Sequence, residues 1–164
     1  MTPILNLHIL AEKFTQLSNA AYFDPAFREF SQRTALATKH AIEQEAQYAP
    51  DIILTLSQQL WRVLQFVSGS RSNDAPHEVQ YVLRKALAEW GEEDALISNA
   101  SLNEFNFFLD PLHLWEFIKV SLNGFDTEGY EKAVVRIAAP EAYKNKPIFC
   151  VPLFHELGHY VDHK

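Results

Sequence analysis

The chain has 164 residues, of which 48% are hydrophobic and 13% aromatic, so it can bury a core and is not expected to be disordered. Its 21 acidic and 14 basic residues give a formal net charge of −7, which argues against nucleic acid as a partner because that interaction needs clustered Lys and Arg. The single cysteine, Cys150, excludes an internal disulfide and a multi-cysteine zinc site, and it favours a cytoplasmic location. The apolar runs fall short of the roughly 18 to 20 residues that span a bilayer, so we expect no membrane segment.

The first ninety residues are predicted to be helical. Asp24 and Pro25 form a helix-start signal, and the run from there to about Gln47 contains neither Gly nor Pro, which predicts one long helix or two short ones. Asp51 opens a second helix, which is so apolar that we expect it at the centre of a bundle, and Ser-Gly-Ser at 68–70 ends it. This part of the chain is therefore expected to form a helical bundle.

The clearest amphipathic helix is expected to begin after Asp74 and Pro76 and to end before Gly91. Apolar residues recur there every three or four positions, which predicts a face that packs in the core. These residues are Val79, Val82, Leu83, Ala86, Leu87 and Trp90.

A mixed pattern follows Gly91. Alternation over residues 105–109 predicts a strand, an Asp-Pro pair opens a short helix expected over about 110–120, and Asn-Gly at 123–124 predicts a turn. Residues 133–139 are rich in Val and Ala and predict a second strand, which a proline ends. Both strands are thus expected in the second half of the chain.

These patterns together predict an α+β fold that is predominantly helical. We expect a helical N-terminal domain over residues 1–92 and a domain of strands and helices over residues 93–164.

Near the C-terminal end stands the sequence His155-Glu156-Leu157-Gly158-His159. Residues four apart share one face of an α-helix, so His155 and His159 can present two imidazole nitrogens to one metal ion. A catalytic zinc normally has three protein ligands and an open position for water, whose pKa the metal lowers. Glu156 would then take the proton of that water and later deliver it to the leaving amine. Apolar flanks predict a buried helix, where unpaired histidines would be costly, and Gly158 leaves room for the metal or a strand.

The string over residues 152–162, PLFHELGHYVD, resembles the active-site helix of zincin metallopeptidases, especially the gluzincin-like ones written HELGH. The resemblance implies zinc-dependent hydrolysis of a peptide or protein substrate, with His155 and His159 as Zn²⁺ ligands and Glu156 as general base. It also implies that the strand around 134–139 is an edge strand with which an extended substrate pairs. It extends over about thirty residues at the C-terminal end.

Two departures from the family concern the third zinc ligand. Gluzincins take that ligand, usually a Glu, from a helix downstream of the motif, and only five residues follow His159. The metzincin pattern fails because Asp162 stands where that pattern has Gly. His163 lies about 12 Å along the helix from His155 at 1.5 Å per residue, so all three histidines cannot reach one ion while the helix stays straight.

We therefore expect the chain to be a fragment, truncated just after the active-site helix, whose downstream segment supplies the third ligand. Alternatively, that ligand comes from upstream, where His113, Glu116 and Asp110 are candidates, or from a second chain.

Other interpretations remain open. The chain could be a non-catalytic binding or regulatory module with an incomplete zincin-like site, and the two histidines could be ordinary core or capping residues. His77 is expected to be a solvated or capping group, the pair His113 and Glu116 an ordinary surface pair, and Cys150 a buried, inert thiol.

Overall fold

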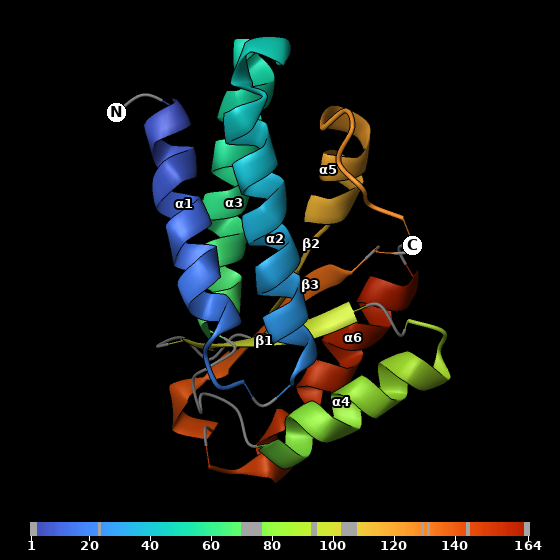
Figure 1. Ribbon diagram of the computed structural model, residues 1–164. Coiled ribbons are helices and arrows are strands. Elements are labelled where there is room, and N and C mark those ends of the chain that lie inside the picture. Colours follow the sequence, from blue (N-terminus) through green and yellow to red (C-terminus); the bar gives the residue numbers. More distant parts are fainter. Residues whose placement is uncertain are drawn as a thin grey trace. The chain divides into compact units, whose positions relative to one another are not determined.

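The computed structural model describes residues 3–22, 24–69, 77–92, 95–102, 108–128, 130, 132–143 and 145–162 (Figure 1). The elements in chain order are α1 (Pro3–Ser18), α2 (Ala26–Glu43), η1 (Glu45–Gln47), α3 (Pro50–Gly69), α4 (His77–Glu89), β1 (Ala95–Leu102), β2 (Phe108–Leu112), α5 (Leu114–Ser121), β3 (Ala133–Pro140), η2 (Glu141–Tyr143), η3 (Pro147–Cys150) and α6 (Pro152–Asp162). The fold is α+β and predominantly helical, as the sequence predicts. Among the described helices, none is both long and apolar enough to cross a membrane.

The chain forms two compact units, each built from two segments. The helical unit contains Met1–Ser68 and His113–Lys132, and the sheet unit contains Gly69–Leu112 and Ala133–Lys164. This division differs from a single boundary at residue 92, because α4 belongs to the sheet unit and α5 to the helical unit. Hydrophobic packing places each of these helices in its unit. That packing joins segments that are distant in the sequence, so local sequence patterns do not reveal it.

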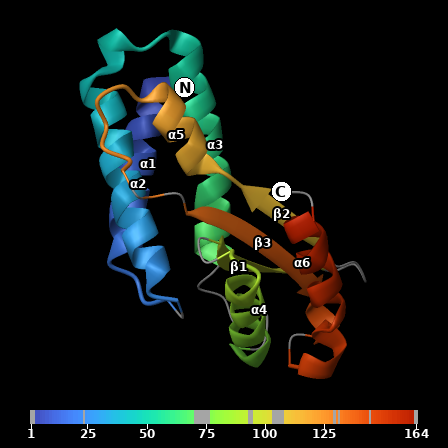
Figure 2. The same ribbon diagram turned by 90° about the vertical axis from the view of Figure 1, so that its right-hand side faces the viewer.

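In the helical unit, α1, α2 and α3 lie side by side, as Figures 1 and 2 both show. The predicted helix start before α2 is confirmed, since the Ala26 N–H donates a hydrogen bond of 3.0 Å to Asp24 Oδ1. The unit's fully buried large side chains are Leu7, Leu10, Phe14, Phe27, Phe30, Leu56, Leu60, Phe66, Leu114 and Ile118. The expected helical bundle therefore extends to α5, which the sequence assigned to the other domain.

The predicted turn at Asn123 and Gly124 is confirmed, and it is anchored within the helical unit. Gly124 has φ +76°, a left-handed conformation that a residue without a side chain adopts without strain. Two side chains far away in the sequence bond the Asn123 carbonyl, His40 Nε2 at 3.0 Å and Tyr48 Oη at 3.1 Å. Burial raises the pKa of the Tyr48 hydroxyl.

In the sheet unit, β3 is the central strand of the order β1-β3-β2. β1 pairs with it in parallel, with Ile97 opposite Val135, and β2 pairs with it in antiparallel, with Leu109 opposite Ile137. The predicted strand over 133–139 is confirmed, but its expected role as an edge strand is wrong, because it is paired on both sides. The edges of the described sheet are β1 and β2.

The residues around β2 overturn another expectation. Asp110 and Pro111 do not open a helix: they lie in β2, opposite Arg136 and Val135, and the helix that follows begins at Leu114. A proline is tolerated there because β2 is an edge strand, where a missing N–H need not break the ladder. The rest of the strand predicted over 105–109 precedes Phe108 and lies outside the described residues.

One hydrophobic core joins α4, the sheet and α6. Its buried members are Val79, Leu83, Leu87, Ala95, Ile97, Val135, Ile137, Cys150, Leu153, Leu157 and Tyr160. The predicted packing face of α4 is thus confirmed for Val79, Leu83 and Leu87, whereas Val82 and Trp90 are 46% and 47% exposed. This core holds α6, which carries the histidine motif, against the sheet.

Candidate metal centre

The motif lies on α6, which has one buried and one exposed face. Leu153, Leu157 and Tyr160 recur at helical spacing and are buried in the core of the sheet unit. His155 and His159 are exposed, and Glu156 is half-buried. The expectation of a buried helix is therefore wrong for the face that carries the histidines, and with it the argument that their burial would be costly without a metal.

The two histidines converge on one point despite their exposure. Their Nε2 atoms are 3.0 Å apart, and their rings meet edge to face with centroids 4.5 Å apart. Two nitrogen ligands of a tetrahedral zinc, each about 2.05 Å from the ion, are about 3.3 Å apart. The observed separation is about 0.3 Å below this value, so the spacing of the two nitrogens is compatible with a two-ligand chelate.

Glu156 follows the first histidine on the same helix, so its backbone is held by the same packing. A carboxylate beside a two-imidazole chelate supplies an acceptor for a proton, and the half-buried position limits competition from bulk water. Two imidazoles and a carboxylate next to one of them in sequence are the residue types that metal-assisted hydrolysis uses. This set is the minimum for metal-assisted hydrolysis, apart from a third ligand.

No such third ligand joins the pair among the residues that the structure describes. In that part of the chain, no group of three or more His, Cys, Asp and Glu side chains could hold a metal ion. Of the upstream candidates, His113 and Glu116 belong to the helical unit, where they contact each other with Nδ1 and Oε1 3.3 Å apart. The side chains of Asp110 and His77, and the whole of His163, are outside the part of the chain that the structure describes.

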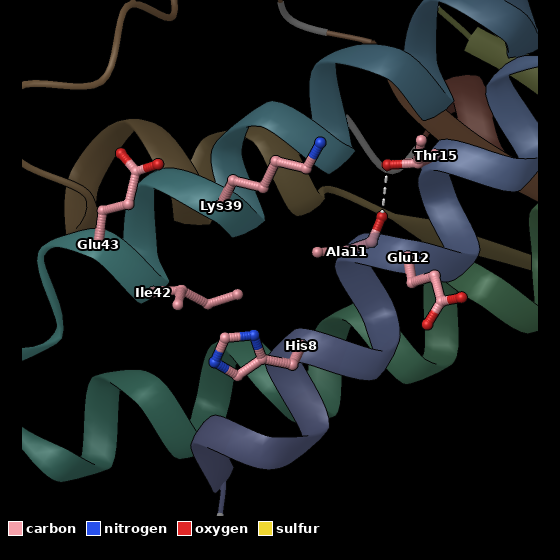
Figure 3. A pocket seen from close by; sticks show the side chains of 7 residues that line it. All are labelled: His8, Ala11, Glu12, Thr15, Lys39, Ile42 and Glu43. Carbon is pink, nitrogen blue, oxygen red and sulfur yellow. Dashed lines mark hydrogen bonds between the residues drawn. The ribbon is translucent and has the colours of Figure 1, made fainter.

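A hollow in the helical unit offers no alternative metal centre. It lies between α1 and α2, has a volume of about 460 Å³, and is lined from both helices (Figure 3). Its lining residues are His8, Ala11, Glu12, Thr15, Lys39, Ile42 and Glu43. The Thr15 hydroxyl already donates a 2.7 Å hydrogen bond to the Ala11 carbonyl, and no metal-binding group is found among the described residues there. The motif on α6 remains the candidate site.

Of the two roles expected for Gly158, making room for a strand is not observed among the described residues. A Cβ built at this position meets nothing within 4 Å, and the backbone does not have a positive φ. We therefore expect Gly158→Ala to raise the free energy of unfolding by about 0.5 to 1 kcal/mol, since alanine is the better helix former. Urea unfolding would measure this. Gly91→Ala is the control: at φ +83° it should lower stability by about 1 kcal/mol. A loss of stability in Gly158→Ala would mean that something covers this face.

Cys150 is 1% exposed, as expected for an inert thiol, and burial raises its pKa. Because the folded-state pKa lies above the unfolded one, the resulting stabilisation is complete below the unfolded pKa of about 8.5 and is lost as pH rises through the folded pKa. We expect the free energy of unfolding to fall above this pH more steeply in the unaltered chain than in Cys150→Ala. Urea unfolding between pH 7 and 10 tests this, and parallel curves would contradict it.

Comparison of the chain with protein-family models, with curated proteins and with solved structures gave no match. The interpretation of the site therefore depends on the motif and on its geometry.

Proposed function

We propose that this chain carries the front part of a zinc-dependent peptidase site on α6. The observation that supports this most directly is the 3.0 Å approach of His155 Nε2 to His159 Nε2, with Glu156 between them in sequence. Two histidines four apart with a glutamate after the first are suited to metal-assisted hydrolysis, because ligands and base share one rigid helix.

In the proposed mechanism, His155 and His159 would hold the zinc through nitrogen donors, which suit this metal. Bound zinc would supply a water of lowered pKa and polarise the carbonyl that is attacked. Glu156 accepts the proton that the attacking water loses and then donates it to the nitrogen of the leaving amine. The glutamate thus serves first as base and then as acid, and it ends the cycle ionised.

We propose that the substrate is an extended peptide that pairs with β2. This strand is an edge of the described sheet and runs antiparallel to β3, and α6 packs near it within the sheet unit. An edge strand offers unpaired backbone N–H and C=O groups, which bind an extended chain whatever its side chains are. β3, which the sequence favoured for this role, has both edges occupied.

The third ligand is proposed to come from a segment beyond α6 or from a second chain. Support comes from the exposure of both histidines, which leaves their face of the helix open to an added donor. The same exposure also favours the rival function, a binding or regulatory module that uses the histidine pair without catalysis. The two functions differ in whether peptide bonds are cut.

A peptide-cleavage assay tests the proposal. The chain, loaded with zinc, would be incubated with a mixture of unstructured peptides, and new N-termini would be identified by mass spectrometry. We expect cleavage with zinc and none after treatment with a chelator, with recovery when zinc is restored. Binding of zinc without any cleavage, both by this chain and by a longer form that extends past Lys164, would favour the non-catalytic module.

A further inference from the structure

The hollow between α1 and α2 has the size of a binding site for a small molecule (Figure 3). Its volume of about 460 Å³ lies within the roughly 300 to 1,000 Å³ that is usual for ligand pockets. The walls come from positions 8, 11, 12 and 15 of α1 and from positions 39, 42 and 43 of α2, a spacing that places each set on one face of its helix. The packing of the two helices in the bundle therefore holds the walls in place.

Opposite charges line this hollow without pairing with each other. Lys39 and Glu43 are four residues apart on α2, yet no ion pair or hydrogen bond joins either of them to another described residue. Lys85 and Glu89 on α4 have the same order and spacing and are also exposed, and their Nζ and Oε1 atoms are 3.8 Å apart. Figure 3 shows the Lys39 ammonium and the Glu43 carboxylate at separate ends of the hollow. Both charges are thus available to a ligand.

The rest of the lining narrows the chemistry of that ligand. Ala11 is 5% exposed and Ile42 is half-buried, so they give the hollow an apolar part that a ligand can cover. Glu12 adds a second negative charge on α1, where it accepts a 3.4 Å hydrogen bond from Gln16 Nε2. Two glutamates disfavour a ligand with negative charge alone, and Lys39 disfavours a ligand with positive charge alone. A zwitterion with an apolar body is complementary to both.

We propose that this hollow binds a dipeptide with apolar side chains. Lys39 binds its terminal carboxylate, Glu43 binds its terminal ammonium, and its side chains cover Ala11 and Ile42. Positions 39 and 43 are about 6 Å apart along the helix at 1.5 Å per residue. An extended dipeptide spans roughly 7 Å, whereas a single amino acid spans about half of this length. The dipeptide can therefore bring one charge to each group, and a single amino acid cannot.

Calorimetric titration of the full chain with leucyl-leucine, in the presence of a chelator, tests the proposal. The hollow belongs to the helical unit and α6 to the sheet unit, so the chelator removes zinc without touching the hollow, and the probe is not hydrolysed. We expect leucyl-leucine to bind at least about tenfold more tightly than N-acetyl-leucyl-leucine, which lacks the ammonium, and than leucyl-leucine amide, which lacks the carboxylate.

Two exposed positions on α2 test which charge binds which end of the dipeptide. Lys39→Met should weaken the binding of leucyl-leucine about tenfold and remove its advantage over the amide, because the partner of the carboxylate is lost. Glu43→Gln should remove the advantage over the acetylated form in the same way. Lys13→Met removes an exposed charge from α1 outside the hollow, so it is the matched control and should have no effect.

No binding of leucyl-leucine up to about 10 mM would overturn the proposal. Equal affinity for the acetylated form would also overturn it, because the ligand would then be recognised as an anion. Unchanged affinity in Lys39→Met would mean that the dipeptide binds elsewhere. None of these results depends on zinc or on peptide cleavage, so this proposal and the proposed function fail separately.

Discussion

The Glu156→Gln variant is expected to lose peptide hydrolysis by a factor of about 10² to 10⁴, the usual contribution of a general acid and base. Glutamine has nearly the same size and fits the half-buried position of Glu156, but its amide cannot take the proton of the attacking water. The loss should appear in kcat, because proton transfer occurs in the transition state and not in substrate binding. Zinc binding should persist, since both histidines remain.

Steady-state kinetics on one peptide identified by the cleavage assay would measure this loss. Asp162→Asn is a matched control, because it removes an exposed carboxylate from the same helix without touching the proposed chemistry. It should leave turnover within a factor of about two, as expected for a surface change away from the site. Unchanged turnover in Glu156→Gln would sink the proposed role of the glutamate.

The His159→Ala variant is expected to weaken zinc binding at least about 100-fold, because a two-point chelate becomes a single imidazole contact. Competition against a chromophoric chelator would measure the affinity. His8→Ala, which removes an exposed histidine from α1, should change nothing. An affinity that is the same in the His159→Ala variant and the unaltered chain would mean that zinc binds elsewhere.

The same titration locates the third ligand. If His113 or Glu116 completes the site, His113→Ala or Glu116→Ala should weaken zinc binding as His159→Ala does. If the ligand comes from a second copy or from a later segment, both variants should bind zinc like the unaltered chain, since these residues contact each other on the helical unit.

Helices with strong local signals were predictable from the sequence. The helix α2 begins directly after Asp24 and Pro25, as expected, and the helix over Pro50–Gly69 ends at the Ser-Gly-Ser run that was expected to end it. β3 was also predictable, because a run of Val, Ile and Ala bounded by proline leaves little alternative. β1 was not: its sequence, ALISNASL, mixes polar and small residues, and pairing with β3 along its length makes it a strand.

Contacts between residues distant in the sequence also explain why the predictions near β2 were wrong. Asp-Pro is a good helix start in isolation, but the backbone of Asp110 and Pro111 pairs with β3, so the helix begins later. Strand pairing joins residues more than twenty positions apart, and no local pattern can report it. The strand order β1-β3-β2 determines which strands lie at the edges of the described sheet. This order also depends on pairing between residues that are distant in the sequence.

For the candidate site, four-residue spacing on a helix is enough to bring His155 and His159 together, because helix geometry depends only on local hydrogen bonds. The spacing does not say which side of α6 faces the core. Packing of Leu153, Leu157 and Tyr160 against the sheet turns the histidines outward and makes the site open instead of buried. That orientation comes from contacts between distant segments, and it leaves both histidines accessible to solvent.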